Sequence, residues 1–436
     1  MSGGSAWTGA AVAAVTAGYA LFSRRLASTP VSAPMVFTGF GALIGPLGLD
    51  VLDLGHDAGP ILTLIEAALA LLLFTDSMTV RRHDLRTGGF LPLRLLSIGL
   101  PLSIAMGWLL AWPLLPGLTL WEFALLGAVL APTDAALGKT ASSSPRVPAL
   151  VRHGLNVESG LNDGLALPFF LMFLAAIPGT TASEEGVGGV FWRALVVSSV
   201  VGLAFGWAGG WLLTLARARS WVMGEWQQVV VLAVAFAAYS VATAVDGSGF
   251  IAAWMGGFAF GVALRKGEPT GAEPAKERPA DLAEYAGGLL GSLSFLVFGA
   301  VLLGPTLEHL DWRIITYAVL SLTVVRMLPV ALALAGTGMR LPTVAYVGWF
   351  GPRGLASVVF GLLLVEDHVP GIELLSRVIA ATIGLSILLH GMSAPYFAVR
   401  YGNWYDAVNA TTPDLREAQD APPGSGKQHG APRRLR

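Results

Sequence analysis

The sequence of 436 residues contains no cysteine and few charged side chains. Without cysteine, disulfide bonds and thiolate chemistry are excluded. Charged residues make up 13% of the chain, whereas soluble globular proteins carry roughly 25%. The charges that are present lie in short clusters between long apolar runs, and 54% of all residues are hydrophobic. This composition excludes an ordinary soluble domain and predicts an all-α membrane protein.

Apolar runs fill nearly the whole chain between Ala6 and Val399. A helix needs about 20 apolar residues to cross about 30 Å of hydrocarbon, so the runs predict about 13 membrane spans. Arg24 and Arg25 follow the first run instead of preceding it as in a secretory signal peptide, which predicts a retained first span. The predicted spans are 6–22, 33–54, 58–79, 89–112, 119–138, 149–176, 188–215, 226–245, 249–264, 285–305, 313–335, 342–364 and 371–398.

Basic residues are concentrated in every second loop between these spans. One set of loops contains the arginines of 24–25 and 81–86 and the basic residues of 265–278, whereas the other contains essentially only Arg313. Because loops rich in Lys and Arg stay in the cytoplasm, we predict an N-terminus outside and a C-terminus inside, as an odd number of spans requires. Residues 403–436 are rich in Pro, Gly and charge, and we predict a disordered cytoplasmic tail there.

Two predicted spans are interrupted by similar motifs. Ala-Pro-Thr-Asp at 131–134 interrupts the fifth span, and Gly-Pro-Arg-Gly at 351–354 interrupts the twelfth. Each proline removes a backbone donor and clashes with the preceding turn, so we predict two discontinuous helices. A shift of seven spans reverses the direction of the chain through the membrane, which predicts inverted repeats. Paired discontinuous helices in inverted halves indicate a transport site, the alternative being a chance coincidence of two prolines.

Ionisable side chains deep within a span cost roughly 2.5–3.5 kcal/mol on insertion scales, so each one suggests a function. In the sixth span, a spacing of four places Glu158 with Asn162, and Ser159 with Asp163, on roughly one helix face. Such an oxygen-rich face suits a small hard cation. An interhelical hydrogen-bonding seam without a transport role would explain Ser159 and Asn162, but not two acids. The deep ionisable residues are Glu66, Asp134, Glu158, Asp163, Arg326 and Arg353.

Thr133, Asp134 and Arg353 lie directly after the two breaks. Arg353 would compensate acidic charge in the site. Two roles remain open for Asp134, namely direct contact with an ion and charge balance of the half-helix ends. If the pKa of Asp163 lies near cytoplasmic pH, its carboxylate binds either a proton or a cation. When the empty carboxylate cannot cross the membrane, this competition alone couples the two movements.

The combined pattern resembles the monovalent cation:proton antiporter-1 family, which contains the sodium/proton exchangers and the prokaryotic NhaP-type antiporters. Residues 247–252 and 390–391 are also similar to that family, and the resemblance covers nearly all of residues 30–398. Ala135 departs from it, because a proline frequently stands there in relatives. The residues that carry the resemblance are Thr133-Asp134, Glu158-Ser159, Asn162-Asp163 and Gly351-Pro352-Arg353-Gly354.

The resemblance implies a transmembrane antiporter domain over residues 1–402, with core spans at about 89–176 and 313–398 and the other spans in a dimerisation domain. It implies a homodimer in the lipid of a prokaryotic cytoplasmic membrane, working by elevator-like movement. Transported Na⁺ or K⁺ and H⁺ are then its small partners. A cofactor, an enzymatic activity and a nucleic-acid partner are not expected.

The resemblance also implies roles for individual residues. Asp163 would bind the transported ion with help from Ser159 and Thr133. Asn162 would brace the crossing region, and Glu158 would pair with Arg353. Electrogenic relatives carry a second Asp in place of the neutral Asn162. The resemblance therefore implies electroneutral exchange of one cation for one proton.

Several alternatives remain at this stage. Na⁺ is the favoured cation and Li⁺ a further substrate, but a K⁺/H⁺ antiporter of the same fold is the main alternative, because oxygen ligands alone do not select the ion. A channel fits less well, since paired interrupted helices suit alternating access. An intramembrane aspartyl protease is a remote alternative, because Asp134 and Asp163 lie in neither a Tyr-Asp nor a Gly-x-Gly-Asp motif. For Glu66 and Asp76 we expect structural or interfacial roles.

Overall fold

A computed structural model describes residues 3–26, 29–46, 48–49, 58–80, 90–134, 137, 144–180, 183, 186–266, 278–367, 369–412 and 415–418. Within these ranges the chain is helical, without a β-strand. Eight of the described helical segments are long and apolar enough to cross a membrane, and three shorter apolar helices accompany them. The all-α membrane class is confirmed, while the number of spans and their orientation stay predictions.

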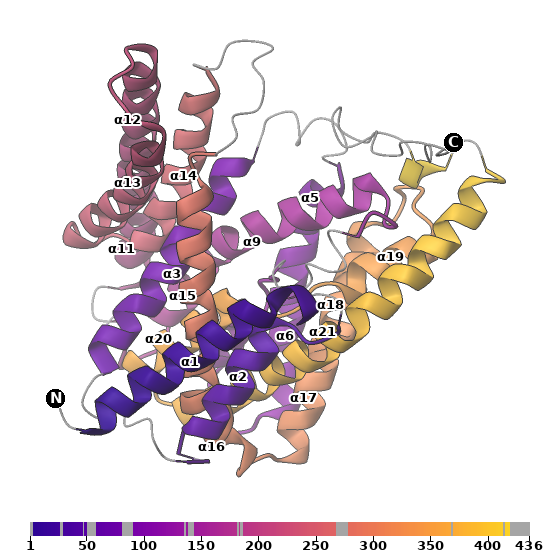
Figure 1. Cartoon of the computed structure of the whole chain (residues 1–436). Helices are drawn as coiled ribbons and strands as arrows, with labels where there is room; N and C mark the ends of the chain where they lie inside the picture. Colours follow the sequence, from indigo (N-terminus) through magenta and orange to yellow (C-terminus); the bar gives the residue numbers. More distant parts are fainter. Residues whose placement is uncertain are drawn as a thin grey trace.

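One group of helices is built around α3 and α14 (Figure 1). Small residues bring membrane helices into close contact, as they do here between α12, α14 and α3. A Cβ atom added to Gly206 would overlap the carbonyl oxygen of Gly256, and one added to Gly257 would overlap that of Phe74. A larger side chain at either position would push these helices apart. The α3–α14 group comprises α1 (Gly3–Leu26), α2 (Ala33–Ile44), α3 (Ala58–Thr79), α11 (Val187–Trp192), α12 (Ser198–Ala218), α13 (Gly224–Ala244), α14 (Gly249–Lys266), α15 (Asp281–Phe298) and α16 (Gly304–Leu307).

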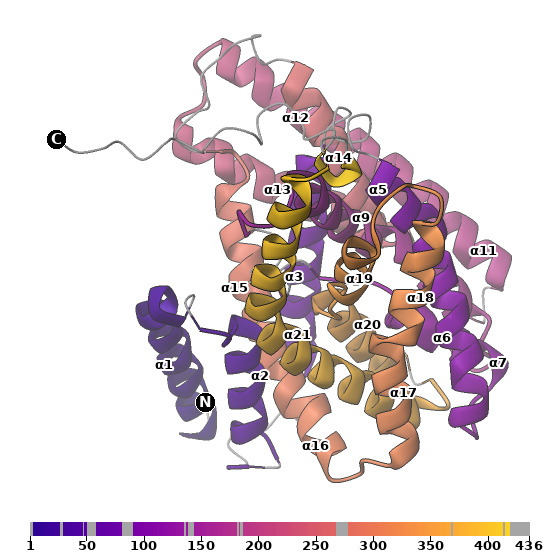
Figure 2. The same cartoon turned by 90° about the vertical axis from the view of Figure 1, so that its right-hand side faces the viewer.

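The second group surrounds the two short helices α7 and α20. Figure 2 shows its α6, α7, α17 and α18 on the side of the molecule opposite to α1 and α2. In both groups, π-helical turns join consecutive helices into longer rods; they lie at Leu95–Gly99, Arg193–Val197 and Gly299–Leu303. The α7–α20 group comprises α5 (Phe90–Arg94), α6 (Leu100–Leu114), α7 (Leu120–Val129), α9 (Ala149–Ala175), α17 (Trp312–Leu322), α18 (Val324–Ala333), α19 (Leu341–Trp349), α20 (Leu355–Glu366) and α21 (Ile372–Asn409).

Glu122 fixes the beginning of α7 against the beginning of α21. It forms a capping box with Thr119, in which the backbone N–H groups of Thr119 and Glu122 both find side-chain acceptors. Its other carboxylate oxygen accepts a hydrogen bond of 2.6 Å from the backbone N–H of Gly371, just before α21. Glu122 is only 1% exposed. The start of the fifth predicted span is therefore held by a buried carboxylate that serves two helices.

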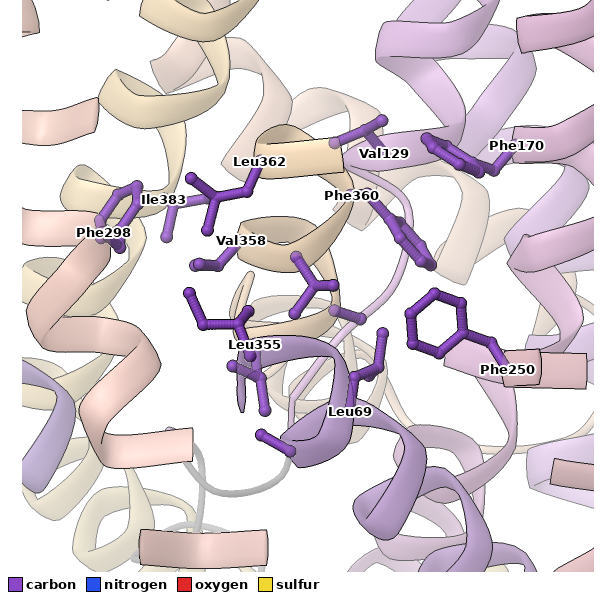
Figure 3. Close-up of a cluster of buried hydrophobic side chains, with 14 of the residues drawn as sticks. Leu69, Val129, Phe170, Phe250, Phe298, Leu355, Val358, Phe360, Leu362 and Ile383 are labelled. Atoms are coloured by element: carbon purple, nitrogen blue, oxygen red, sulfur yellow. The ribbon is translucent and has the colours of Figure 1, made fainter. Parts of the chain in front are cut away.

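Apolar side chains from both groups meet in the centre of the molecule (Figure 3). Figure 3 shows Phe360 of α20 between Phe170 of α9 and Phe250 of α14. The rings of Phe170 and Phe360 stack with centroids 4.7 Å apart. Because lipid tails are as apolar as these rings, close packing stabilises the cluster more than transfer from the bilayer does.

Each predicted span contains at least one helix, but the predicted tail is partly wrong. α21 continues to Asn409 instead of ending near residue 398, and Arg416–Ala418 form a 3-10 turn. Within this turn Glu417 is 2% exposed, and it accepts hydrogen bonds of 2.9 Å from Arg340 N and 2.7 Å from Thr343 Oγ1. These bonds satisfy donors at the N-terminus of α19, a local contact that average composition does not reveal. Residues 419–436 lie outside the described residues.

Candidate functional site

The two predicted interruptions are confirmed, and they lie against each other. α7 ends at Val129 and α19 at Trp349, and residues 131–134 and 350–354 are not helical. The backbone N–H of Asp134 donates to the carbonyl oxygen of Pro352 at 2.8 Å. Of residues 135–143, which follow the first break, only Leu137 is described. The described parts of the two breaks thus form one crossing joined by a backbone hydrogen bond.

Two side chains of opposite charge complete this crossing. Asp134 Oδ2 accepts a hydrogen bond of 3.1 Å from the N–H of Leu355, the first residue of α20. The guanidinium of Arg353 donates to the carbonyl oxygen of Ala131 at 2.7 Å, just beyond the end of α7. Anions are favoured at helix N-termini and cations at C-termini. Asp134 therefore balances a half-helix end, which is one of its two predicted roles, and Arg353 balances the other end.

The predicted pairing of Glu158 with Arg353 is wrong. Glu158 of α9 forms a buried bidentate ion pair with Arg326 of α18, with N···O distances of 2.6 and 3.0 Å. Both side chains are at most 4% exposed. Arg353 Nη1 donates instead to the carbonyl oxygens of Ala131 and Pro132 in the first break, at 2.7 and 3.4 Å. The sequence marked Arg326 as a deep cation, but spacing along the chain could not show which arginine reaches Glu158.

Thr133 in the first break is the partner of two residues on the predicted polar face of α9. Ser159 Oγ donates to the carbonyl oxygen of Thr133 at 2.9 Å. Asn162 Nδ2 donates to Thr133 Oγ1 at 2.6 Å and to its carbonyl oxygen at 3.2 Å. Asn162 is 1% exposed. The amide thus braces the broken helix against α9, as the resemblance implied.

A cavity of about 830 Å³ opens onto this face of α9. Ser159, Asp163 and Asp134 line it, so the predicted residues come together around one space, and Thr133 lies directly behind Ser159. Asp76 of α3 lines the same cavity, and a Cβ atom at Gly160 of α9 would lie 3.4 Å from that of Asp76. From the sequence we expect a structural or interfacial role for Asp76, because an acid in the last turn of an apolar helix fits an interfacial position, but the structure places it at the cavity.

Two side-chain oxygen atoms on this face of α9 have no hydrogen-bond donor in the described part of the chain as a partner, and one of them belongs to Asp163, which lines the cavity. Among the described residues, Asp163 Oδ1 and Asn162 Oδ1 are buried and accept no hydrogen bond. No three His, Asp or Glu side chains of the described residues converge so that they could share a metal ion. Asp163 supplies a carboxylate to the cavity, and Ser159 and Thr133 supply hydroxyl and carbonyl oxygens beside it. Hard cations prefer such oxygen ligands, and a buried carboxylate can equally take up a proton.

The chain is also similar to known protein families and sequences. The family model described as "Sodium/hydrogen exchanger, transmembrane" matches residues 11–400. The chain is similar to Na⁺/H⁺ antiporter 2 of Zygosaccharomyces rouxii, with 26% identity over 358 residues that cover 74% of this chain and 41% of that protein. It is also similar to the K⁺/H⁺ antiporter NhaP of Alkalimonas amylolytica, with 25% identity over 378 residues, 84% of this chain and 62% of that protein. The aligned region is thus less than two thirds of either relative.

Among solved structures, the fold is similar to that of the sodium proton antiporter MjNhaP1 from Methanocaldococcus jannaschii. The TM-score is 0.73, and the match covers 92% of this chain and 98% of the other. Only 18% of the aligned residues are identical. This likeness shows a similar course of the backbone.

Proposed function

Because this chain belongs to the sodium/hydrogen exchanger family, whose transmembrane model matches residues 11–400, we propose that it exchanges a monovalent cation for protons across a membrane. Asp163 is the group for which cation and proton compete. The family is one of transporters and not of enzymes, in agreement with the motifs of the sequence. The protein is a multi-pass membrane protein, and we place it in the cytoplasmic membrane of a prokaryote.

One observation carries the proposal. Asp163 has a buried oxygen without a protein donor, and it lines a cavity of about 830 Å³ beside the crossing of two discontinuous helices. A carboxylate in this position needs a cation or a proton as its partner, because an unpaired buried charge is costly. The carbonyl oxygen of Thr133, held by Ser159, and the hydroxyl of Ser159 supply neutral oxygens nearby.

The finer proposal concerns stoichiometry and the choice of ion. Asn162, next to Asp163 in the sequence, has a neutral amide that does not titrate. This amide donates a hydrogen bond to Thr133. One titrating group then carries one cation or one proton in each passage, which makes the exchange electroneutral. We favour Na⁺, with Li⁺ as a further substrate. K⁺ is the alternative, supported by the names of relatives from Alkalimonas and Shewanella as K⁺/H⁺ antiporters.

Alternating access would arise from movement of the α7–α20 group against the α3–α14 group. The cavity lies between them, because Asp163 comes from α9 and Asp76 from α3. A displacement of α9 along α3 would therefore carry Asp163 past Asp76 and change the side from which water reaches it. In this proposal the α3–α14 group forms the interface of a homodimer and stays fixed in the lipid.

The test is a dye assay of proton movement in proteoliposomes with an imposed pH gradient. Na⁺, Li⁺ and K⁺ are added in turn, with and without an ionophore that clamps the voltage. We expect each transported cation to dissipate the gradient at a rate that does not depend on voltage. Asp163→Asn should abolish the response, because the amide binds neither a proton nor a cation by charge.

Asp311→Asn is the matched control, since Asp311 is exposed and caps α17 without a side-chain hydrogen bond. It should retain the wild-type response. Undiminished exchange in Asp163→Asn, or no cation-induced proton movement in the wild type, would refute the proposed function. Rates that depend on voltage would refute one-for-one exchange while leaving antiport intact.

A further inference from the structure

A second cavity lies along α19, the half-helix that leads to the second break. It has a volume of about 590 Å³ and shares no lining residue with the cavity at Asp163. Figure 2 shows α19 between α18 and α21, and residues of all three helices line the groove. Its lining is strongly aromatic, with Tyr346, Trp349, Phe350, Phe397, Tyr401 and Trp404.

Arg400 is the single charged residue among those that line this groove. It is exposed, and its guanidinium donates to Tyr396 Oη at 3.3 Å. Among the described residues, no carboxylate forms a salt bridge with Arg400. An arginine without an acidic partner at the mouth of an aromatic groove leaves most of its donors available for a ligand. Planar guanidinium groups bind phosphate through paired hydrogen bonds.

The length of α21 and the aromatic neighbours of Arg400 fit a position of this residue near a membrane surface. Near the other end of this helix, Glu373 is 86% exposed, which marks the opposite surface. Arg400 follows Glu373 by 27 residues, and a rise of 1.5 Å per residue gives about 40 Å. This distance is close to the 40–45 Å of a bilayer with its headgroups. Tyr401 and Trp404 lie beside Arg400, as aromatic residues do at membrane interfaces.

The groove then extends inward by about the depth of one leaflet. α19 has nine residues, from Leu341 to Trp349, and so a length of about 13 Å. Half of the hydrocarbon core is about 15 Å thick. Phe350, at the inner end of the groove, directly precedes the break. The groove thus combines a cation at headgroup depth with an aromatic channel as long as the space available to an acyl chain.

We propose that this groove binds an anionic phospholipid of the surrounding bilayer, with its phosphate at Arg400 and an acyl chain along α19. A zwitterionic phospholipid carries a cation that offsets the attraction of its phosphate for Arg400, so the anionic class is selected. The lipid would support α19 from the side of the membrane. Trp349, whose Nε1 donates to Ser393 Oγ of α21 at 2.9 Å, forms part of the wall that the chain would contact. This site does not depend on the proposed exchange activity.

The test uses the purified full chain in detergent, with phosphatidylglycerol and phosphatidylcholine of identical acyl chains as probes. Native mass spectrometry counts the bound lipids, and thermal unfolding reports the stabilisation. We expect phosphatidylglycerol to bind more tightly and to raise the unfolding temperature more. Arg400→Gln should lower the affinity for phosphatidylglycerol about tenfold, as loss of a charged hydrogen-bonding partner predicts, and leave phosphatidylcholine unchanged.

Two further variants separate the headgroup from the chain. Ala345→Trp fills the groove and should weaken both lipids. Arg219→Gln removes a comparable exposed arginine, which lies 5.0 Å from the ring of Trp221, and should bind both lipids as the wild type does. Equal affinity of the wild type for the two lipids would overturn the proposal, as would unchanged selectivity in Arg400→Gln. Full stabilisation by sn-glycerol 3-phosphate, which has no acyl chains, would also overturn it.

Discussion

The ion pair between Glu158 and Arg326 gives the sharpest prediction for stability. The pair is bidentate, with N···O distances of 2.6 and 3.0 Å. Both side chains are at most 4% exposed, so each charge is stabilised by the other and not by water. Removing one partner of such a pair costs about 3–5 kcal/mol, because the other charge stays buried and unpaired. We therefore expect Arg326→Leu and Glu158→Leu each to destabilise the protein by about this amount.

The double variant should be less destabilised than the two single variants together. Replacing both partners of a buried pair by apolar residues is often nearly neutral, because no charge remains to be desolvated. Since each single change costs about 3–5 kcal/mol and the double change is nearly neutral, the coupling free energy of Glu158 with Arg326 should be at least about 3 kcal/mol, the top of the usual range for residues in contact. Arg353 donates to Ala131 instead of Glu158, so a cycle of Glu158 with Arg353 should give a smaller coupling free energy than the cycle with Arg326.

These free energies can be measured by reversible unfolding in mixed micelles with increasing SDS. The unfolding midpoint and slope of each variant yield its stability, and both cycles use the same Glu158→Leu background. A larger coupling of Glu158 with Arg353 than with Arg326 would refute the geometry. Additive effects of Glu158→Leu and Arg326→Leu would show that the pair is not formed in the membrane protein.

Further predictions concern the crossing, the tail and the cavity. Gly354→Ala puts a Cβ atom onto the carboxylate of Asp134 and should destabilise by about 1–3 kcal/mol, whereas Gly288→Ala, which has open space, should be neutral in the same unfolding assay. Glu417→Gln weakens the hydrogen bonds to the start of α19 and should lower stability by about 1–2 kcal/mol; an unchanged midpoint would show that the 3-10 turn is not docked. Asp76→Asn removes an acid from the cavity and should raise the KM for the cation in the proteoliposome assay, so an unchanged KM would contradict a role in cation entry.

The sequence was most informative where a single residue type has one structural consequence. Pro132 and Pro352 cannot continue a helix, and both predicted interruptions are present in the structure. Apolar runs likewise located the helices, because a membrane helix must be apolar along its length. The i, i+4 spacing in the sixth span correctly placed Ser159 and Asp163 at one cavity.

Pairing between distant segments was less predictable. Arg326 and Arg353 are both deep arginines, and only the three-dimensional path of α18 shows that Arg326 reaches Glu158. α17 ends at Leu322 and α18 begins at Val324, and Thr323 between them has a non-helical backbone conformation. Because of this interruption, the helical periodicity of α17 does not predict which way the side chains of α18 point. Residue spacing in the sequence therefore could not show that Arg326 faces Glu158.

The contacts of Asp76 and Glu417 could not be predicted for a different reason. Each is a single acid in a segment whose average character indicates something else, an apolar span for Asp76 and a polar tail for Glu417. Only the neighbours supplied by other helices, α9 for Asp76 and α19 for Glu417, give them a role. Composition averaged over a window cannot detect such contacts.

The central claim, that cation and proton compete for Asp163, is tested most directly by calorimetry of cation binding in two buffers with different heats of protonation. At a pH where Asp163 is protonated, binding of Na⁺ or K⁺ to the wild type should release about one proton per cation bound, the amount expected for competition at one carboxyl group. Asp163→Asn should bind neither cation measurably. Cation binding without proton release, or binding that persists in Asp163→Asn, would contradict the claim.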